Sequence, residues 1–310
     1  QVTSGNIAAV DADEPGSVAK VITVAAALNE GTVTPDTIFE VPWRKQYSDT
    51  MLHDAEQHPT EWWPVSTILT KSSNIGTIEV MLSMGQSLRQ TKEIQDAYMR
   101  AFGLGDTAPL DFPGESVGIL KDWKKWEGAE QYTMSYGQGV ASTSIQLVTA
   151  VNVIANDGVY VAPKLVKATI GPTGELVETP PSSTHRVVRT EVADQVNLML
   201  RDVVCEGTAS RAAVPGVSIA GKTGTGLKAQ PNGTYVNEAG ERTYYASFVG
   251  FFPAEDPEVT VLISIDEPPA GELTRFGGTA AAPVFAEIAP SIMHELDVTP
   301  PSEDSGCPVG

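Results

Sequence analysis

Basic residues are scarce in this chain. Its 310 residues include 20 Lys and Arg against 39 Asp and Glu, so the formal net charge is −19 at pH 7. A surface of this sign repels phosphate backbones and anionic lipid head groups. The composition therefore excludes charge-driven binding of nucleic acid or of an acidic membrane, and it predicts a well-solvated acidic surface.

Cysteine and histidine are also rare, with two and four copies. Cys205 and Cys307 have no histidine at the spacing of a zinc site, so the sequence predicts no metal. The two cysteines are either free thiols or, in an oxidising compartment, a disulfide. The four histidines form no ligand motif, and the sequence gives them no role.

Long apolar runs and dinucleotide-binding motifs are missing as well. No stretch approaches the roughly 18 apolar residues of a membrane span, no signal peptide opens the sequence, and GxGxxG does not occur. What is present is ordinary globular composition, with 41% hydrophobic and 19% charged residues. A chain of this length supports one large core or two smaller ones.

Helical periodicity dominates the first half of the sequence, and strand-like runs follow in the second. The stretch 32–64 has scattered Pro, Trp and His and is interpreted as loop-rich. Tyr244–Phe252 and Val259–Ile265 are nearly continuous apolar runs, typical of central strands buried on both faces. The predicted helices are 17–30, 65–69, 75–82, 88–102, 145–155, 192–203 and 284–296, and the predicted strands are 159–161, 165–170, 217–225, 244–252 and 259–265.

One short motif lies at the start of the first helix, where Ser17 and Lys20 form S-x-x-K. Helical spacing puts the two side chains on one face, so the amine can reach the hydroxyl. A lysine that is partly desolvated and near another cation has a lowered pKa and can act as a base. On its own the motif is weak, since an N-cap serine followed by a surface lysine is common.

Two further motifs follow. Ser72-Ser73-Asn74 is S-x-N at a predicted helix–helix junction, where a hydroxyl and an amide can face one cleft, although a plain capping turn has the same residues. Lys222-Thr223-Gly224-Thr225 ends a predicted strand, with a glycine that permits close approach of a ligand backbone. Its lysine and threonine side chains suit a carboxylate.

The order S-x-x-K, S-x-N, K-T-G resembles the motif set of penicillin-binding proteins and class A β-lactamases. Most of the chain is similar to the transpeptidase domain of a class B (monofunctional) penicillin-binding protein, of the cell-division type in particular. The resemblance is carried by EPGSVAKVITVAAAL, ILTKSSNIGT, LDFPGESVGIL, SYGQGVASTSIQLVTAVNVIANDG, AGKTGTG and FGGTAAAPVF.

The resemblance implies an α/β (α+β) fold of the penicillin-binding and serine β-lactamase type. An antiparallel sheet flanked by helices would adjoin a mostly helical lobe, with the active site between them. Residues 1–296 would form the transpeptidase domain, with the helical lobe at about 32–165, and 297–310 an irregular tail.

The resemblance also implies roles for the motif residues. Ser17 would be the acylated nucleophile, Lys20 its base, and Ser72 a proton relay. Asn74 would bind the donor peptide and steady Lys20, while Lys222 would supply positive charge. Thr223 or Thr225 would bind the substrate carboxylate beside Gly224, and the backbone N–H groups of Ser17 and Thr225 would form the oxyanion hole.

The implied reaction is D,D-transpeptidation, in which a stem peptide ending in D-Ala-D-Ala acylates Ser17 and a neighbouring amine closes a peptidoglycan crosslink. No cofactor is expected, and β-lactams would acylate the same serine. The implied location is the extracytoplasmic face of the bacterial inner membrane. The family's N-terminal membrane anchor is not in these residues, and a membrane glycosyltransferase and division proteins are the expected partners of the full-length protein.

Three other functions stay open: a serine β-lactamase, a D,D-carboxypeptidase and a non-catalytic β-lactam-binding sensor. A β-lactamase needs a base for the deacylating water, and none is evident; the middle motif also lacks the aspartate of S-D-N. Carboxypeptidase and transpeptidase share the donor chemistry, so sequence separates them poorly.

Two structural expectations complete the sequence reading. An extracytoplasmic location permits a Cys205–Cys307 disulfide, which would anchor the tail, and free thiols are about equally compatible with the sequence. The connection Leu227–Thr243 is expected to be a mobile hairpin loop that gates the site, because long loops are often functional.

Overall fold

A three-stranded antiparallel sheet forms the centre of the second half of the molecule. The computed structural model describes residues 6–110, 112–228, 234–236, 240–269, 271, 274–299 and 306–307. Within these ranges the sheet order is β11–β12–β13, with Lys222 opposite Val249 and Val249 opposite Leu262. The strands are β11 (Ala220–Leu227), β12 (Tyr244–Phe252) and β13 (Val259–Asp266).

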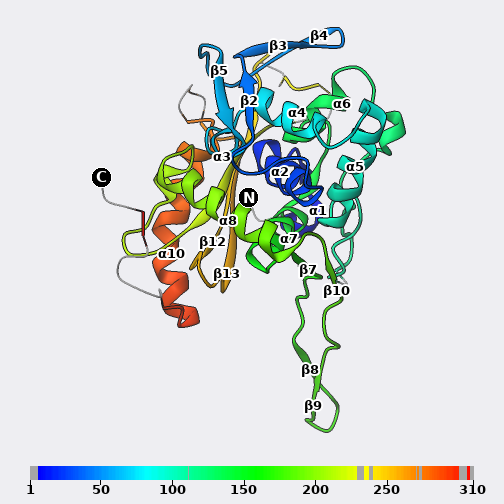
Figure 1. Cartoon of the computed structure of the whole chain (residues 1–310). Coiled ribbons are helices and arrows are strands. Elements are labelled where there is room, and N and C mark those ends of the chain that lie inside the picture. Colours follow the sequence, from blue (N-terminus) through cyan, green and yellow to red (C-terminus); the bar gives the residue numbers. More distant parts are fainter. Residues whose placement is uncertain are drawn as a thin grey trace.

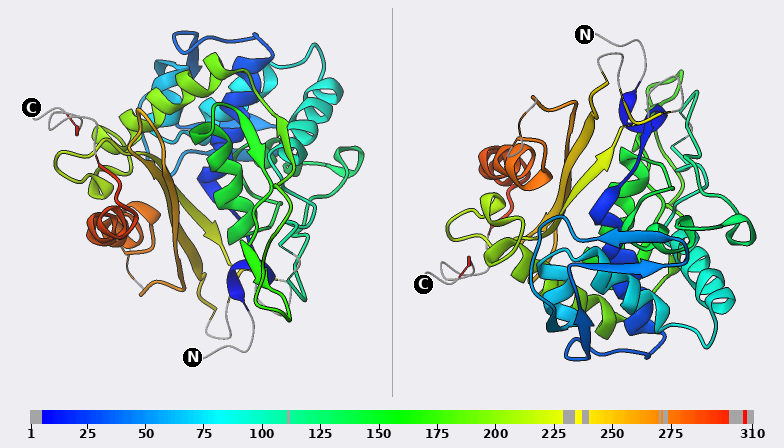
Figure 2. Two further views of the ribbon diagram at one scale, coloured as in Figure 1. Left: turned by 90° about the horizontal axis from the view of Figure 1, so that it is seen from below. Right: turned by 90° about the horizontal axis from the view of Figure 1, so that it is seen from above.

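Helices cover both faces of this sheet (Figure 2). On one face, Phe285 of α10 (Ala282–Leu296) packs edge-on against Phe248 and Phe252, with ring centroids 4.8 and 5.7 Å apart. On the other face lie α7 (Ser144–Ala155) and α8 (Thr190–Cys205). Buried aromatic side chains of β12 thus tie the sheet to its helical layers.

The helix α2 (Lys20–Asn29) runs through the interior of the molecule and is buried from Lys20 to Leu28 (Figure 1). Its small apolar residues allow close packing with α4, α5 and α8. Other helices in this part of the molecule are α3 (Val65–Thr70), α4 (Asn74–Leu82), α5 (Leu88–Ala101) and α6 (Glu130–Thr133).

The structure corrects the interpretation of 32–64 as loop-rich. This stretch contains two two-stranded antiparallel sheets, β2–β5 and β3–β4, above the helices in Figure 1. Each strand has only four residues and buries at most one side chain fully, so its pattern gives no strong period. The strands are β2 (Ile38–Val41), β3 (Arg44–Tyr47), β4 (Thr50–His53) and β5 (Glu61–Pro64).

Two other predictions differ from the structure. The expected helix at 17–30 begins as a 3₁₀ turn, η1 (Gly16–Ala19), and becomes α-helical at Lys20. β13 was expected to be buried on both faces, but its residues are half-buried or exposed, because it lies at the end of the described sheet. The middle strand β12 is buried from Ala246 to Phe252.

A long hairpin projects from the body, where β7 pairs with β10 and β8 pairs with β9 (Figure 1). The remaining elements are short. They are α1 (Ile7–Val10), β1 (Ala12–Asp13), β6 (Ser142–Thr143), β7 (Val159–Val161), β8 (Ala168–Ile170), β9 (Leu176–Glu178), β10 (Thr184–Arg186), α9 (Gly277–Ala280), and the 3₁₀ turns η2 (Trp123–Lys125), η3 (Met134–Tyr136) and η4 (Ser210–Ala212).

A disulfide joins Cys205, the last residue of α8, to Cys307 in the tail, with the two Cα atoms 5.2 Å apart. Of the two open alternatives for these cysteines, the structure has the bridged one. Residues 297–299 and 306–307 have no helix or strand, and the irregular tail at 297–310 stays a prediction. The division of the chain into lobes at 32–165 stays a prediction. Among the described helices, none is long and apolar enough to cross a membrane.

Candidate active site

The turn that carries Ser17 lies directly against strand β11. Gly16 has φ of +52°, and a Cβ atom there would sit 2.5 Å from the carbonyl oxygen and 3.0 Å from the nitrogen of Thr225. On the strand side, a Cβ at Gly224 would lie 2.8 Å from the carbonyl oxygen of Pro15. The two glycines let the backbones touch, so half-buried Ser17 is held beside the K-T-G strand.

Lys20 is the first residue of α2, and its amine is fully buried. Its Nζ donates to the backbone carbonyl of Ser72 and lies 3.2 Å from Ser72 Oγ. The S-x-x-K helix therefore meets the S-x-N turn, although 52 residues separate Lys20 from Ser72 in the sequence.

Lys222 reaches the same hydroxyl from the sheet. Its Nζ donates to Ser72 Oγ at 2.9 Å and to the carbonyl of Thr223 at 3.2 Å, and its side chain is also fully buried. Ser72 Oγ thus accepts from two lysines that come from opposite sides of the site. The three sequence motifs converge on this one oxygen atom.

Burial controls the protonation of both lysines. Loss of solvent lowers the pKa of Lys20 to about 7, although the Asp54 carboxylate partly opposes this effect. Burial and the neighbouring charge of Lys20 lower the pKa of Lys222 well below its usual range. Near neutral pH a substantial fraction of Lys20 is a free amine, which is the form that can accept a proton.

The S-x-N turn has an unusual backbone. Ser72 has φ of +59°, a left-handed conformation that is uncommon for a residue with a side chain. Ser73 is the N-cap of α4, and its Oγ accepts from Gly76 N at 2.8 Å. The Asn74 amide donates to the carbonyl of His53 at 3.0 Å. The predicted contact of Asn74 with Lys20 is not among the hydrogen bonds of the described residues and stays a prediction.

The two threonines of the K-T-G strand have different surroundings. Thr223 is buried, and its hydroxyl lies 2.8 Å from that of Thr208. Thr225 is half-buried, and its Oγ1 accepts from Gly277 N at 3.2 Å. Thr225 is therefore the more accessible of the two candidates for the carboxylate.

Some groups at the site were missed by the motif analysis. The ring of Tyr136 lies 5.9 Å from Lys20 Nζ, and Gly277 bonds Thr225. Asp54, in the stretch interpreted as a loop, contacts the S-x-N turn directly. FGGTAAAPVF was quoted for the resemblance and could have drawn attention to Gly277, but no local signal marks Asp54.

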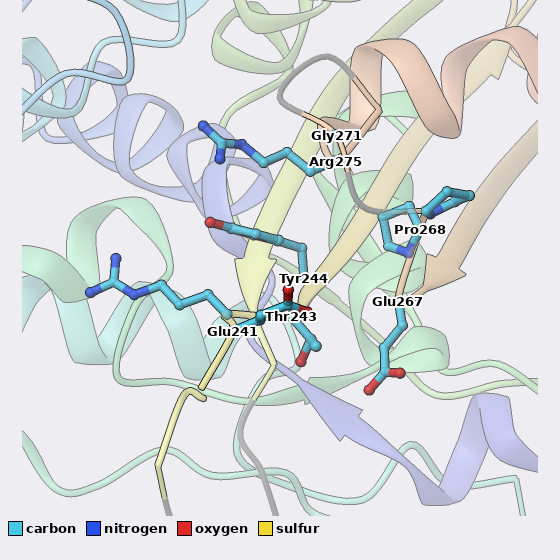
Figure 3. Close-up of a pocket in the computed structure, with 9 residues that line it drawn as sticks. Glu241, Thr243, Tyr244, Glu267, Pro268, Gly271 and Arg275 are labelled. Atoms are coloured by element: carbon cyan, nitrogen blue, oxygen red, sulfur yellow. The ribbon is translucent and has the colours of Figure 1, made fainter. Parts of the chain in front are cut away.

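A pocket of about 420 Å³ lies at the end of the β11–β12 ladder (Figure 3). Tyr244 pairs with Leu227, two residues beyond Thr225, and the guanidinium of Arg275 stacks 5.3 Å from the Tyr244 ring. The pocket therefore adjoins the K-T-G strand. Its lining residues are Glu241, Arg242, Thr243, Tyr244, Glu267, Pro268, Pro269, Gly271 and Arg275.

The predicted gating loop Leu227–Thr243 lies partly outside the described residues, and its mobility stays a prediction. Of its described residues, Tyr235 donates through its hydroxyl to Glu14 Oε1 at 2.9 Å. Glu14 is buried just ahead of Ser17, and burial raises the pKa of its carboxyl. In the part of the chain that the structure describes, no group of three His, Cys, Asp or Glu side chains is placed to hold a metal ion.

Comparison with known proteins places this geometry in a family. Residues 3–290 match the model of the penicillin binding protein transpeptidase domain. The chain is 36% identical to the penicillin-binding protein PbpB of Mycobacterium tuberculosis over 98% of its own length and 44% of the relative's. It is 34% identical to the probable peptidoglycan D,D-transpeptidase PenA of Neisseria flavescens over 95% of this chain and 68% of that one.

Solved structures agree. Penicillin binding protein 3 of Mycobacterium tuberculosis, complexed with aztreonam, superposes with a TM-score of 0.85 at 33% identity over 97% of this chain and 67% of that one. The transpeptidase domain of penicillin-binding protein 3 from Burkholderia pseudomallei gives 0.81 at 34% identity, over 96% and 83%.

The chain spans somewhat less than half the length of the PbpB relatives. The family match nevertheless covers the S-x-x-K, S-x-N and K-T-G motifs and nearly all of the described elements. The predicted fold class is confirmed by these superpositions. This chain belongs to the penicillin-binding protein transpeptidase domain family, as the transpeptidase domain of a class B penicillin-binding protein.

Proposed function

We propose that this domain is a D,D-transpeptidase that crosslinks peptidoglycan stem peptides through an acyl-enzyme on Ser17. Ser17 Oγ attacks the carbonyl between the two terminal D-alanines of a donor stem, an ester forms, and D-alanine leaves with a proton. The amine of a neighbouring stem then attacks the ester, which restores the serine and forms the crosslink.

The convergence of Lys20 and Lys222 on Ser72 Oγ supports this proposal most directly. A free Lys20 amine can take the proton of Ser17, which lies one helical turn earlier. Ser72 Oγ, within hydrogen-bond distance of Lys20, can pass a proton to the leaving amine. The chemistry therefore uses only side chains that the fold already brings together.

The substrate carboxylate would bind at Thr225, with Lys222 as the positive charge. An anion in this position favours the ammonium form of Lys222 and so opposes the effect of burial on its pKa. Lys20, repelled by that ammonium, would then stay neutral and act as the base. The adjacent backbones of Gly16 and Thr225 support the N–H groups of Ser17 and Thr225 as the oxyanion hole.

An extended stem peptide would lie along β11, which is the end strand of the described sheet. The names of relatives agree with this substrate class, since PenA is a probable peptidoglycan D,D-transpeptidase and a penicillin binding protein 3 relative is complexed with ampicillin. We place the domain on the extracytoplasmic face of the membrane, where an enzyme that builds peptidoglycan acts and a disulfide persists.

We assign the full-length protein to cell division, with a membrane glycosyltransferase and division proteins as partners, on the resemblance described above. One relative is the stage V sporulation protein D of Bacillus subtilis, at 33% identity. The division role is therefore tested separately, by depletion of the protein and observation of whether cells filament or lose their rod shape.

The test of the activity is a reaction of the purified domain with a donor peptide ending in D-Ala-D-Ala and an acceptor amine. A transpeptidase releases D-alanine and forms the crosslinked product. Release of D-alanine with only hydrolysed peptide would indicate a carboxypeptidase, and rapid turnover of penicillin would indicate a β-lactamase. A stable penicillin adduct with no reaction on peptide would identify a sensor.

A further inference from the structure

Asp54 is a buried carboxylate with no part in the mechanism described so far. It follows β4 directly and is only 5% exposed. One oxygen accepts from the backbone N–H groups of Asn74 and, at 2.9 Å, of Ile75. The other accepts from Ser73 Oγ at 2.7 Å and pairs with His58 Nε2 at 3.0 Å. Both oxygens are thus saturated by donors, three of which come from the segment 73–75.

These donors belong to the first turn of α4, immediately after Ser72. A carboxylate is stabilised at a helix N-terminus by the free N–H groups and the positive end of the helix dipole. Ser72 itself has a left-handed backbone, which costs about 1–2 kcal/mol for a residue with a side chain. A strained turn persists only when surrounding contacts hold it in place. Asp54 provides such contacts to residues 73–75, which directly follow Ser72.

The backbone around Asp54 fixes the other half of the motif. The carbonyl of His53 accepts from the Asn74 side chain at 3.0 Å, and Asp54 N donates to the carbonyl of Trp43 at 2.8 Å. The β3–β4 hairpin therefore positions Asp54, and the end of β4 orients both the backbone and the side chain of Asn74. Ser72 and Asn74 take their places from a segment that is distant from all three motifs in sequence.

Asp54 also acts on the charge of the site. Its negative charge raises the pKa of Lys20 against the effect of burial. Other titratable groups face these residues. Lys222 has its pKa lowered by the charge of Lys20, and His58 pairs with the second Asp54 oxygen. The buried tyrosines Tyr136 and Tyr47 also lie nearby, and Tyr47 is bonded to Glu79. Among these groups, Asp54 is the carboxylate whose charge acts on the Lys20 amine.

We propose that Asp54 is a positioning residue of the acylation reaction: its carboxylate holds Ser72 and Asn74 in place and supplies a negative charge near the buried Lys20 amine. This inference rests on the function proposed above. Asp54 touches no reacting atom and acts through the Ser72–Asn74 turn and through Lys20.

The test compares Asp54→Asn with the unaltered domain in acylation by a penicillin, measured as a rate constant and a binding constant from pH 5 to 9. Displacement of the turn should lower the rate constant about 10- to 100-fold with little change in binding. Loss of the negative charge should lower the pKa of Lys20, so the rising limb of the pH profile should move to lower pH.

Two matched variants separate charge from structure. Ser73→Ala removes one donor to Asp54 and one cap of α4 but no charge, so it should slow acylation and leave the limb in place. Asp49→Asn makes the same substitution at an exposed site in the same hairpin and should change neither. If Asp54→Asn does not fold, Asp54→Ser retains an acceptor for the turn and gives the same reading of the limb.

The titration of the Lys20 amine, followed by NMR of labelled lysine, gives a reading that needs no acylation. A limb and a Lys20 titration that both stay in place in Asp54→Asn, in a protein that acylates, would overturn the inference alone. A Lys20 titration that moves in Asp54→Asn, together with an unaltered domain that never forms a penicillin adduct, would overturn the proposed function alone. Wild-type acylation rates in Asp54→Asn would also overturn the inference.

Discussion

At the scale of single residues, the main feature of the site is two lysines that the fold buries away from water. Lys20 and Lys222 are fully buried, yet both amines hydrogen-bond Ser72 Oγ. A buried ammonium is costly, and the site limits this cost by lowering the pKa of each amine. The same burial favours the neutral amine of Lys20, which is the form that the proposed base requires.

The pH dependence of acylation follows from this burial. The pKa of Lys20 is about 7, so the neutral form that accepts a proton is scarce at pH 5 and predominant at pH 9. The acylation rate constant should therefore rise about tenfold per pH unit below 7 and level off above it. Stopped-flow acylation with a chromogenic β-lactam measures this profile, and a rate that is flat from pH 5 to 9 in folded protein contradicts a lysine base.

Sequence alone predicted the residues that recur in short motifs and missed those that act from a distance. The motifs S-x-x-K, S-x-N and K-T-G predicted Ser17, Lys20, Ser72 and Lys222. The structure brings the amines of Lys20 and Lys222 to the hydroxyl of Ser72. Asp54 was missed, because its partners in the S-x-N segment are 19 to 21 residues away and its surroundings have no clear period. The catalytic roles of the motif residues stay predictions.

At the scale of elements, the site depends on contact between the turn η1 and strand β11. There is no room for a side chain at the contact, because Gly16 faces the backbone of Thr225 and Gly224 faces the carbonyl of Pro15, just ahead of η1. The sequence predicted a helix start at Ser17 and a strand end at Thr225, but not that their backbones touch. Such contacts depend on tertiary packing, which no local pattern reports.

Gly16→Ala tests this contact. The added Cβ would meet the Thr225 backbone at 2.5 Å in a left-handed conformation, so unfolding free energy should fall by about 3 kcal/mol or more and acylation about 100-fold. Gly31→Ala is the matched control, since Gly31 also has positive φ but nothing within 4 Å. It should cost only about 1 kcal/mol and leave acylation unchanged.

Urea denaturation and acylation kinetics measure both variants. Equal losses of stability and of acylation in Gly16→Ala and Gly31→Ala would show that only the backbone conformation of each glycine matters. The contact between η1 and β11 would then not contribute to function. The four strands of 32–64 illustrate the same limit of sequence patterns, because strands of four residues with at most one fully buried side chain are set by their partners rather than by alternation.

At the scale of the whole molecule, the disulfide ties the C-terminal tail to α8 across 102 residues. The sequence left the pairing of Cys205 and Cys307 open, since cysteine count says nothing of proximity. In the fold, the Cα atoms of Cys205, at the end of α8, and of Cys307 are 5.2 Å apart, which is an ordinary distance for a disulfide.

Removal of this bridge should destabilise the domain without changing its chemistry. For a loop of this length the chain-entropy model gives about 4.7 kcal/mol, and measured losses are typically about 2–4 kcal/mol. Cys205→Ser should therefore lower the Tm by about 5–15 °C. The double variant with Cys307→Ser should match the single one, and acylation below the transition should be unchanged; an unaltered Tm contradicts a structural role.

The central claim is that Ser17 is the acylated residue of a transpeptidase site. It is tested most directly by intact-mass spectrometry of the domain after incubation with penicillin, followed by peptide mapping, in parallel with Ser17→Ala. The account predicts one stable adduct per chain, on the peptide that contains Ser17, and none on the Ser17→Ala protein. That variant should stay folded, because Ser17 lies inside η1 and neither η1 nor α2 has a side-chain cap hydrogen bond. An adduct that maps to another residue, or one that persists in Ser17→Ala, would contradict it.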